Sequence, residues 1–284
     1  MEILLRPPVA ADAPACGRII YRAFKSIAER HGFQPDFPNP EAAISVAEML
    51  IAHPSIYGVV AESNGLVVGS NFLDERDEIR GVGPITVTPQ SQDQGVGRRL
   101  MEAVIERASG AAGIRLLQDA FNSRSMSLYA SLGFEVKEPV VLITGRLSGP
   151  SPRVDVRGLK GEDLAECAAL CRKVHGFDRS NELRDALHGL APLVVRRNGR
   201  ITAYASTVAF FAHGVAETIE DMQALLLAAG SATREPIFFL LPTRQAELFK
   251  WCLSKGMRII KPMTLMAMGE YHEPAGCFFP SVAY

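Results

Sequence analysis

The chain has 284 residues, of which 48% are hydrophobic, 21% are charged and 7% are aromatic. Its 30 Lys and Arg residues balance 31 Asp and Glu residues, and the formal net charge is -1. This balance excludes bulk attraction to nucleic-acid phosphates or to anionic lipid. At roughly 150 residues per domain, the length predicts about two domains, each large enough to bury its own core.

The beginning of the sequence and its cysteines indicate a cytoplasmic protein. Residues 1–8 lack a basic stretch followed by a long apolar core, so they are interpreted as a first strand rather than a secretory signal. No apolar run approaches the roughly 18 residues of a membrane-spanning helix. The cysteines are odd in number and include no Cys-x-x-Cys pair, which favours reduced, buried thiols. They are Cys16, Cys167, Cys171, Cys252 and Cys277. The six histidines have no recognisable metal-binding spacing, so we expect no metal site.

The first half of the sequence alternates between strand and helix patterns. In chain order it predicts strand 2–5, helices 12–30 and 41–52, strands 57–62, 66–73 and 82–88, helix 95–109, strand 114–119, helix 123–132 and strand 134–143. We therefore predict a mixed α/β sheet.

A turn-rich stretch between Gly145 and Pro152 predicts the domain boundary, which gives domains of residues 1–147 and 153–284. The second half then predicts strand 154–157, helices 162–175 and 180–189, hairpin 193–208, helix 217–230, strand 236–241, helix 244–255 and strand 258–268. Residues 270–284 are expected to form a packed extended segment.

Three matches in the same order indicate that the two halves are an internal repeat. Arg, Asp and Cys recur with the same spacing where a strand passes into a helix, first at Arg6 and again at Arg157. Each half then has an Asn-Gly hairpin turn, at Asn64 and at Asn198. Near its end, each half has a helix that closes on glycine.

The segment most typical of a chemical function is Gln92-Asp93-Gln94-Gly95-Val96-Gly97-Arg98, which leads from a β-rich run into a helix. Glycines at a helix N-terminus let the backbone approach an anion, and the free N–H groups of the first turn bind phosphate oxygens. A P-loop would need Lys-Ser/Thr after the second glycine, where this chain has Arg98-Arg99. A dinucleotide fingerprint would need a third small residue, where it has Leu100.

The segment resembles the acetyl-CoA loop of the GCN5-related N-acetyltransferase (GNAT) superfamily, Gln/Arg-x-x-Gly-x-Gly/Ala, and fills every specified position. The resemblance covers about residues 3–145 and implies two tandem GNAT-like domains, each a mostly antiparallel central sheet flanked by helices. It also implies an acetyl-CoA site in which a strand at Ile85 and Val87 contacts the pantetheine arm and the loop amides hold the pyrophosphate. The implied cofactor-binding residues are Ile85, Val87, Gln92, Asp93, Gln94, Gly95, Val96, Gly97, Arg98, Asn122 and Ser125.

A second part of the resemblance lies on the helix that begins at residue 123. Asn122, Ser125 and Tyr129 are three and four residues apart and share one helical face. The resemblance implies that Asn122 binds the pantetheine amide and that Tyr129 protonates the departing CoA thiolate. The alternatives are that Asn122 only caps the helix and that Tyr129 is only a core aromatic residue.

The sequence offers several candidates for the base that takes the proton of an acceptor amine. Asp74 and Glu75 lie in an acidic segment between two central strands, in the region where the family binds its acceptors. Asp119, at the end of a central strand, is a further candidate. The alternative for the acidic segment is a solvated hairpin.

The second half has no equivalent of the glycine loop, since its corresponding helix begins with acidic residues that would repel a pyrophosphate. It therefore resembles a degenerate GNAT domain, and we expect one cofactor site per chain. The function implied is transfer of an acetyl group from acetyl-CoA to an amine of a small molecule or protein by direct attack in a ternary complex. The alternative is a non-catalytic CoA-binding module or an interaction scaffold. No nucleic-acid or membrane partner is expected, and the chain is expected to be a monomer or a homodimer.

Overall fold

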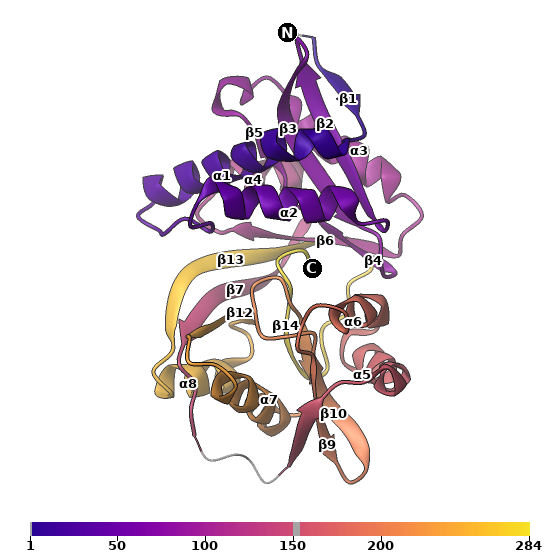
Figure 1. Ribbon diagram of the computed structural model, residues 1–284, viewed down its shortest axis with the longest axis vertical. Coiled ribbons are helices and arrows are strands. Elements are labelled where there is room, and N and C mark those ends of the chain that lie inside the picture. The colour runs from indigo at the N-terminus through magenta and orange to yellow at the C-terminus, as the bar shows by residue number, and fades with distance from the viewer. Residues whose placement is uncertain (1, 150–153) are drawn as a thin grey trace.

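The computed structural model describes residues 2–149 and 154–284, which form two halves joined by long curved strands (Figure 1). The first half contains β1 (Leu4–Arg6), α1 (Ala13–Arg30), α2 (Pro40–Ala52), β2 (Ile56–Ser63), β3 (Leu66–Asp74), β4 (Ile79–Val82), β5 (Thr86–Val87), α3 (Val96–Arg107), β6 (Gly113–Asp119), α4 (Ser123–Ser131) and β7 (Glu135–Gly145).

The second half repeats nearly the same order of elements. It contains β8 (Asp155–Gly158), α5 (Leu164–His175), α6 (Ser180–Ala186), β9 (Leu193–Arg197), β10 (Arg200–Ala205), β11 (Gly214–Ala216), α7 (Ile219–Ser231), β12 (Ile237–Pro242), α8 (Ala246–Ser254), β13 (Arg258–Gly269) and β14 (Cys277–Phe279). Part of the predicted linker, residues 150–152, lies outside the described residues, and the domain boundary stays a prediction.

The strands form two sheets, and the larger sheet contains strands from both halves. Its order is β1-β2-β3-β4-β6-β13-β7-β12, with β5 paired to β3, while the smaller sheet has the order β14-β11-β10-β9-β8. The mixed α/β fold with mostly antiparallel sheets is thus confirmed. The sequence did not indicate that β13 of the second half would lie between β6 and β7 of the first (Figure 1).

The exchange of strands is symmetric, as expected for an internal repeat. β13 and β7 pair antiparallel, with Met263 opposite Val140. On one side Met263 also pairs with Asp119 of β6, and on the other Val140 pairs with Pro242 of β12. In the larger sheet, β13 therefore lies beside β6 of the first half, and β7 lies beside β12 of the second half.

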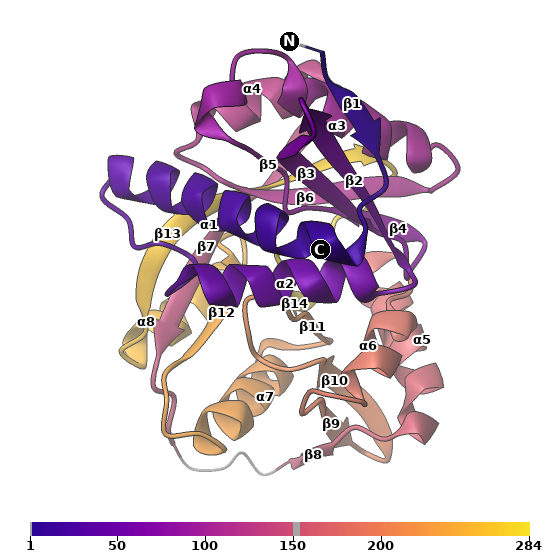
Figure 2. The ribbon, with the colours of Figure 1, turned by 45° about the horizontal axis from the view of Figure 1, so that its top comes forward.

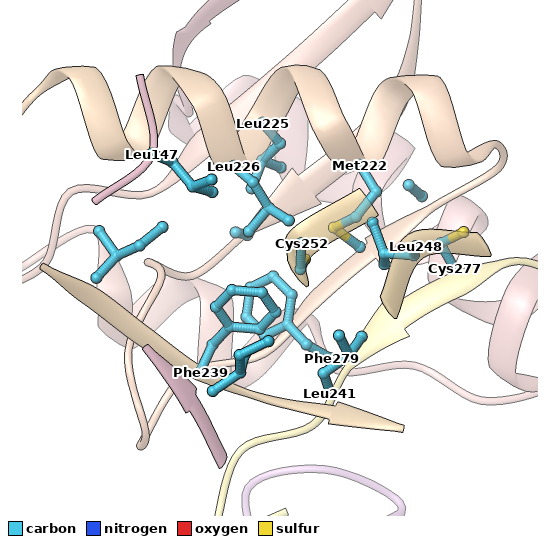
Figure 3. Packing of buried hydrophobic residues seen from close by; sticks show 14 of the residues in the cluster. Leu147, Met222, Leu225, Leu226, Phe239, Leu241, Leu248, Cys252, Cys277 and Phe279 are labelled. Atoms are coloured by element: carbon cyan, nitrogen blue, oxygen red, sulfur yellow. The ribbon is translucent and has the colours of Figure 1, made fainter. Parts of the chain in front are cut away.

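The hydrophobic cores follow the same exchange. Met266 of β13 is fully buried in the core of the first half with Leu100 of α3. Leu147, just after β7, packs in the core of the second half, where Figure 3 shows it beside Leu226 of α7. Because burial of one such side chain contributes about 1.5–3 kcal/mol, each half depends on the other for part of its core.

The faces of the first-half strands are covered by different helices. Val60 of β2 packs with α1 and α2, whereas its neighbour Val59 packs with α3. Alternate residues of a strand point to opposite faces, so α1 and α2 cover one face and α3 covers the other. Figure 2 shows α1 and α2 side by side across the sheet. None of the helices in residues 2–149 and 154–284 is long and apolar enough to span a bilayer.

The predicted repeat of Arg and Asp is visible as the same ion pair in both halves. Arg6 donates to both carboxylate oxygens of Asp12 at 2.7 and 3.0 Å, and Arg157 donates to those of Asp163 at 2.7 and 2.8 Å. Each Asp also accepts a backbone N–H three residues earlier, at 2.8 Å. The pair thus fixes the turn from the first strand of each half into its first helix.

The predicted Asn-Gly hairpins are also confirmed as equivalent. Asn64 and Asn198 have φ of 50° and 52°, and the glycine after each has φ of 76° and 80°. Two consecutive positive φ values define a type I′ turn, whose twist matches that of the flanking strands.

The predicted single strand 82–88 is wrong. β4 ends at Val82, and the chain continues as the short β5, which pairs with Gly69 and Ser70 of β3. Gly83 has φ of 137° and Pro84 has no N–H to donate, so the ladder is interrupted here. The interruption turns β5 away from β6, whose parallel pairing with β4 covers only residues 79–81 and 113–115.

We predict that Asp163→Asn lowers the free energy of unfolding by about 2 kcal/mol at pH 7, because the hydrogen bonds from Arg157 hold the pKa of Asp163 below its usual value. The carboxylate form stabilises the fold above the unfolded-state pKa of about 3.9, and this contribution disappears as the pH falls through the lower folded-state pKa. Urea unfolding of wild type and variant should therefore converge towards acid pH. Glu162→Gln, on the exposed side of the same turn, is the control, and an equal effect there would contradict this account.

Candidate functional site

A cavity of about 950 Å³ opens where β5 turns away from β6. Residues 82–87 form one side and residues 116–119 the other, while α1, α2 and α4 supply further walls. Side chains of the second half complete it, among them Phe210, Lys261 and Met263. The interruption after β4 therefore creates the site, and both halves enclose it.

The predicted glycine loop lines this cavity. Gly95 caps α3 with φ of 77°, and Gly97 is in the first turn of the helix. Within the described part of the chain, the backbone N–H groups of residues 94–98 have no hydrogen-bond acceptor. Free N–H groups at the positive end of a helix are suited to a phosphate anion.

Side chains around the loop hold it in place. The Gln92 amide donates to the carbonyl of Val87 at 3.2 Å and accepts from Arg124 of α4 at 3.0 Å. Arg124 also pairs with Asp93, and Arg98 donates to the Ser131 hydroxyl at 2.6 Å. Arg124 was not among the residues that we predicted, because its contact with the loop depends on the packing of α4.

The predicted cofactor-binding residues do not all face the cavity. Those that line it are Ile85, Val87, Gln92, Asp93, Gly95, Gly97, Arg98, Asn122 and Ser125. The side chain of Val96 is instead buried in the core, and Gln94 donates to the carbonyl of Gln90 at 2.9 Å. These two positions can contribute only through their backbone N–H groups.

Asn122 and Tyr129 have the positions that the helical spacing predicts. Asn122 caps α4, because its side-chain oxygen accepts a hydrogen bond from the Ser125 N–H at 3.3 Å. The helix-capping role that the sequence offered as an alternative is therefore present. Tyr129 lines the cavity but is only 7% exposed, and its pKa is raised by burial and by the nearby charge of Asp119. The phenol is therefore protonated at neutral pH and able to donate a proton.

The two carboxylates proposed from the acidic segment lie in different surroundings. Asp74 lines the cavity, where Arg76 donates to both of its oxygens at 3.0 Å. Glu75 does not line the cavity, and its carboxylate accepts from Arg107 at 2.9 and 3.0 Å. The ion pair turns Glu75 towards α3, so the structure does not bring it to the site.

Two residues that the sequence did not predict lie beside Asp119 in the cavity. The ammonium group of Lys261 lies 2.6 Å from Asp119 Oδ1 and 2.6 Å from Asp36 Oδ1. Lys261 is 1% exposed, and burial raises the pKa of Asp119 while Lys261 opposes the rise. No local pattern connects these residues, since the strand exchange alone brings Lys261 to β6.

A buried amide also faces the cavity without a partner. Gln118 of β6 is 6% exposed, and neither its amide nitrogen nor its amide oxygen has a hydrogen-bond partner among the described residues. A buried polar group of this kind costs free energy unless a ligand or water satisfies it. No group of three or more His, Cys, Asp or Glu side chains suited to a metal ion occurs within residues 2–149 and 154–284.

Part of the chain matches a known protein family. Residues 54–136 match the family model described as an acetyltransferase (GNAT) domain. A putative acetyltransferase from Pyrococcus horikoshii is similar over 97% of this chain and 94% of its own, with a TM-score of 0.75 and 17% identity. No curated protein sequence matches the chain.

Two further solved structures resemble nearly the whole chain. A GCN5-related N-acetyltransferase from Sphaerobacter thermophilus covers 96% of this chain and 98% of its own, with a TM-score of 0.61 and 15% identity. Another from Anabaena variabilis covers 94% of this chain and 72% of its own, with a TM-score of 0.59 and 11% identity. At these identities the likeness concerns the fold, including both halves.

We predict opposite effects of alanine at the two loop glycines on stability. Gly95→Ala should lower the free energy of unfolding by about 1 kcal/mol, because a Cβ disfavours its positive φ. Gly97→Ala should raise it by up to about 1 kcal/mol, because the position is helical and a Cβ there would meet nothing nearer than 3.6 Å. Urea unfolding measures both, and changes of equal sign would contradict the loop geometry.

Proposed function

Because residues 54–136 match the GNAT domain model, we propose that the chain is an N-acetyltransferase that uses acetyl-CoA and acetylates an amine by direct attack in a ternary complex. The proposal rests on one observation. The loop, whose backbone N–H groups are free, and the side chain of Tyr129 line the same cavity. A donor held at the loop would thus extend towards a group able to protonate its leaving thiolate.

In this proposal each part of the site has one task. The N–H groups of residues 94–98 bind the pyrophosphate, and the edge of β5, at Val87, faces the pantetheine arm. The amine nitrogen attacks the thioester carbonyl, forming a C–N bond as the C–S bond breaks. Tyr129 then donates its proton to the departing thiolate, which its raised pKa supports because the phenol is protonated at the start.

We propose a single acetyl-CoA site in each chain. The equivalent helix of the second half, α7, is capped by Thr218, whose hydroxyl accepts from the Asp221 N–H at 3.2 Å. Its first turn also carries Glu220 and Asp221, which would repel a phosphate from the helix end. The second half thus supports the proposal as a domain that has kept the fold without the anion-binding loop.

We predict that Gly97→Glu abolishes acetyl-CoA binding, as measured by calorimetry, while the protein remains folded. The variant introduces a carboxylate into the anion site without backbone strain. Gly110→Glu, beyond the other end of α3, adds the same charge away from the cavity and should bind acetyl-CoA as the wild type does. Wild-type protein that fails to bind acetyl-CoA would contradict the proposal.

We predict that Tyr129→Phe lowers kcat for release of free thiol about 10- to 100-fold and leaves the affinity for acetyl-CoA within about twofold. The hydroxyl is needed only as the thiolate leaves, so binding should not depend on it. Steady-state kinetics with an accepted amine measures kcat. A protein that binds acetyl-CoA but shows no acceptor-dependent thiol release with any amine would instead be a non-catalytic CoA-binding module.

A further inference from the structure

The buried cluster of Asp119, Lys261 and Asp36 does not balance its own charge. Two carboxylates share one ammonium group, so the cluster carries a net charge of -1 when all three are ionised. Asp119 and Lys261 are 7% and 1% exposed, and water therefore screens this charge poorly. A buried net charge is costly unless a counter-charge approaches it, and the cavity is the open side of the cluster.

Other acidic side chains in the cavity are compensated more fully or are more exposed. Arg76 binds Asp74 through both of its carboxylate oxygens. Glu182 is paired with Arg179 and lies 2.8 Å from the Nδ1 of His213. Asp185 has a side chain that is 44% exposed. The site that attracts a further cation most strongly is therefore the one at Asp119.

The walls around this cluster are largely apolar and aromatic. Five phenylalanines line the cavity, and they come from both halves: Phe24, Phe37, Phe121, Phe210 and Phe211. The ring of Phe210 lies 5.8 Å from the Lys261 ammonium group, and that of Phe121 stacks on Phe33 at 4.4 Å. Such walls favour a ligand that has an apolar or aromatic body.

The cluster lines the same cavity as Tyr129, the group that would protonate the thiolate. The charge of Asp119 acts on the hydroxyl of Tyr129, and both residues line the same cavity. An amine bound at Asp119 would therefore lie near the end of a donor held by the loop.

From this arrangement we infer that Asp119, held in place by Lys261 and Asp36, binds the ammonium group of a small aromatic or apolar primary amine and accepts its proton. The inference rests on the proposed function and names its acceptor class and its base. Lys261 is a positioning residue, supplied to the active site of the first half by β13 of the second.

The reaction step balances in charge and atoms. The amine binds as an ammonium ion, gives one proton to Asp119 and attacks the acetyl carbonyl as a neutral nitrogen. After the C–N bond forms and the C–S bond breaks, the amide nitrogen releases its remaining surplus proton to water and the thiolate takes the proton of Tyr129. Water then returns the proton of Asp119 to solvent and reprotonates Tyr129 as the products leave.

The first test is equilibrium binding of 2-phenylethylamine by calorimetry, with and without acetyl-CoA, because binding requires no turnover. Wild type should bind it at least about tenfold more tightly than 2-phenylethanol, spermidine or glutamate. Asp119→Asn should lose at least about tenfold in affinity for this amine and keep its affinity for acetyl-CoA. Equal binding of the amine and the alcohol, or no effect of Asp119→Asn, would overturn the inference.

The second test is the pH dependence of kcat/KM with 2-phenylethylamine. The charged or titratable groups that affect the pKa of Asp119 are Lys261, Asp36 and His31, and Asp119 in turn raises the pKa of Tyr129. Lys261→Met removes a cation that favours the ionised form of Asp119, so the acidic limb of the kcat/KM profile should move to higher pH by about one unit. Asp36→Asn removes a neighbouring negative charge, so the same limb should move to lower pH. Lys261→Arg keeps the cation and should return the acidic limb part of the way to its wild-type pH. If these residues acted through packing alone, the two variants would not shift the limb in opposite directions.

Controls separate this inference from the proposed function. Lys250→Met removes an exposed lysine and should leave the profile unchanged. If Lys261→Met does not fold, the double variant Lys261→Met/Asp36→Asn removes one charge of each sign and should still retain amine binding through Asp119. A chain that binds 2-phenylethylamine through Asp119 but never binds acetyl-CoA would overturn the proposed function alone. A chain that acetylates amines with unchanged kinetics in Asp119→Asn would overturn this inference alone.

Discussion

The backbone pairing of β7 with β13 holds the two halves of this molecule together, and the site depends on it. Each of these strands also pairs with a strand of the other half, so that β6, β13, β7 and β12 form a continuous part of one sheet. Because backbone hydrogen bonds continue from strand to strand across this region, no unpaired strand edge lies between the two halves. The core residues Met266 and Leu147 each lie in the half to which they do not belong by sequence.

The pairing also explains how one functional site can use both halves of a repeat. The first half kept the glycine loop at α3, whereas Thr218 and acidic residues occupy the equivalent helix start at α7. The second half, which lacks the glycine loop, still contributes to the first, because β13 carries Lys261 beside Asp119. In the proposed site, the first half supplies the glycine loop, and the second half supplies the buried cation of Lys261 and part of the aromatic wall.

Features that depend on short stretches of sequence could be predicted. The Asn64-Gly65 turn and the loop ending at Gly97 are each set by residues close together in the chain. The repeated spacing of Arg6 and Asp12 predicted the repeat, although not the ion pair that these residues form. The break after β4 was missed because Gly83 and Pro84 lie within an otherwise β-rich run. The contact of Lys261 with Asp119 could not be predicted, since it depends on a pairing between distant strands rather than on local propensity.

A crystal structure of the chain with CoA and 2-phenylethylamine would test the central claim most directly, namely that the exchanged strand completes an acetyl-transfer site. The account predicts the pyrophosphate on the N–H groups of residues 94–98 and the amine nitrogen about 3 Å from the carboxylate of Asp119, with Lys261 still bound to that carboxylate. CoA bound away from the loop, or the amine bound at Asp74 with Asp119 left without a ligand, would contradict it.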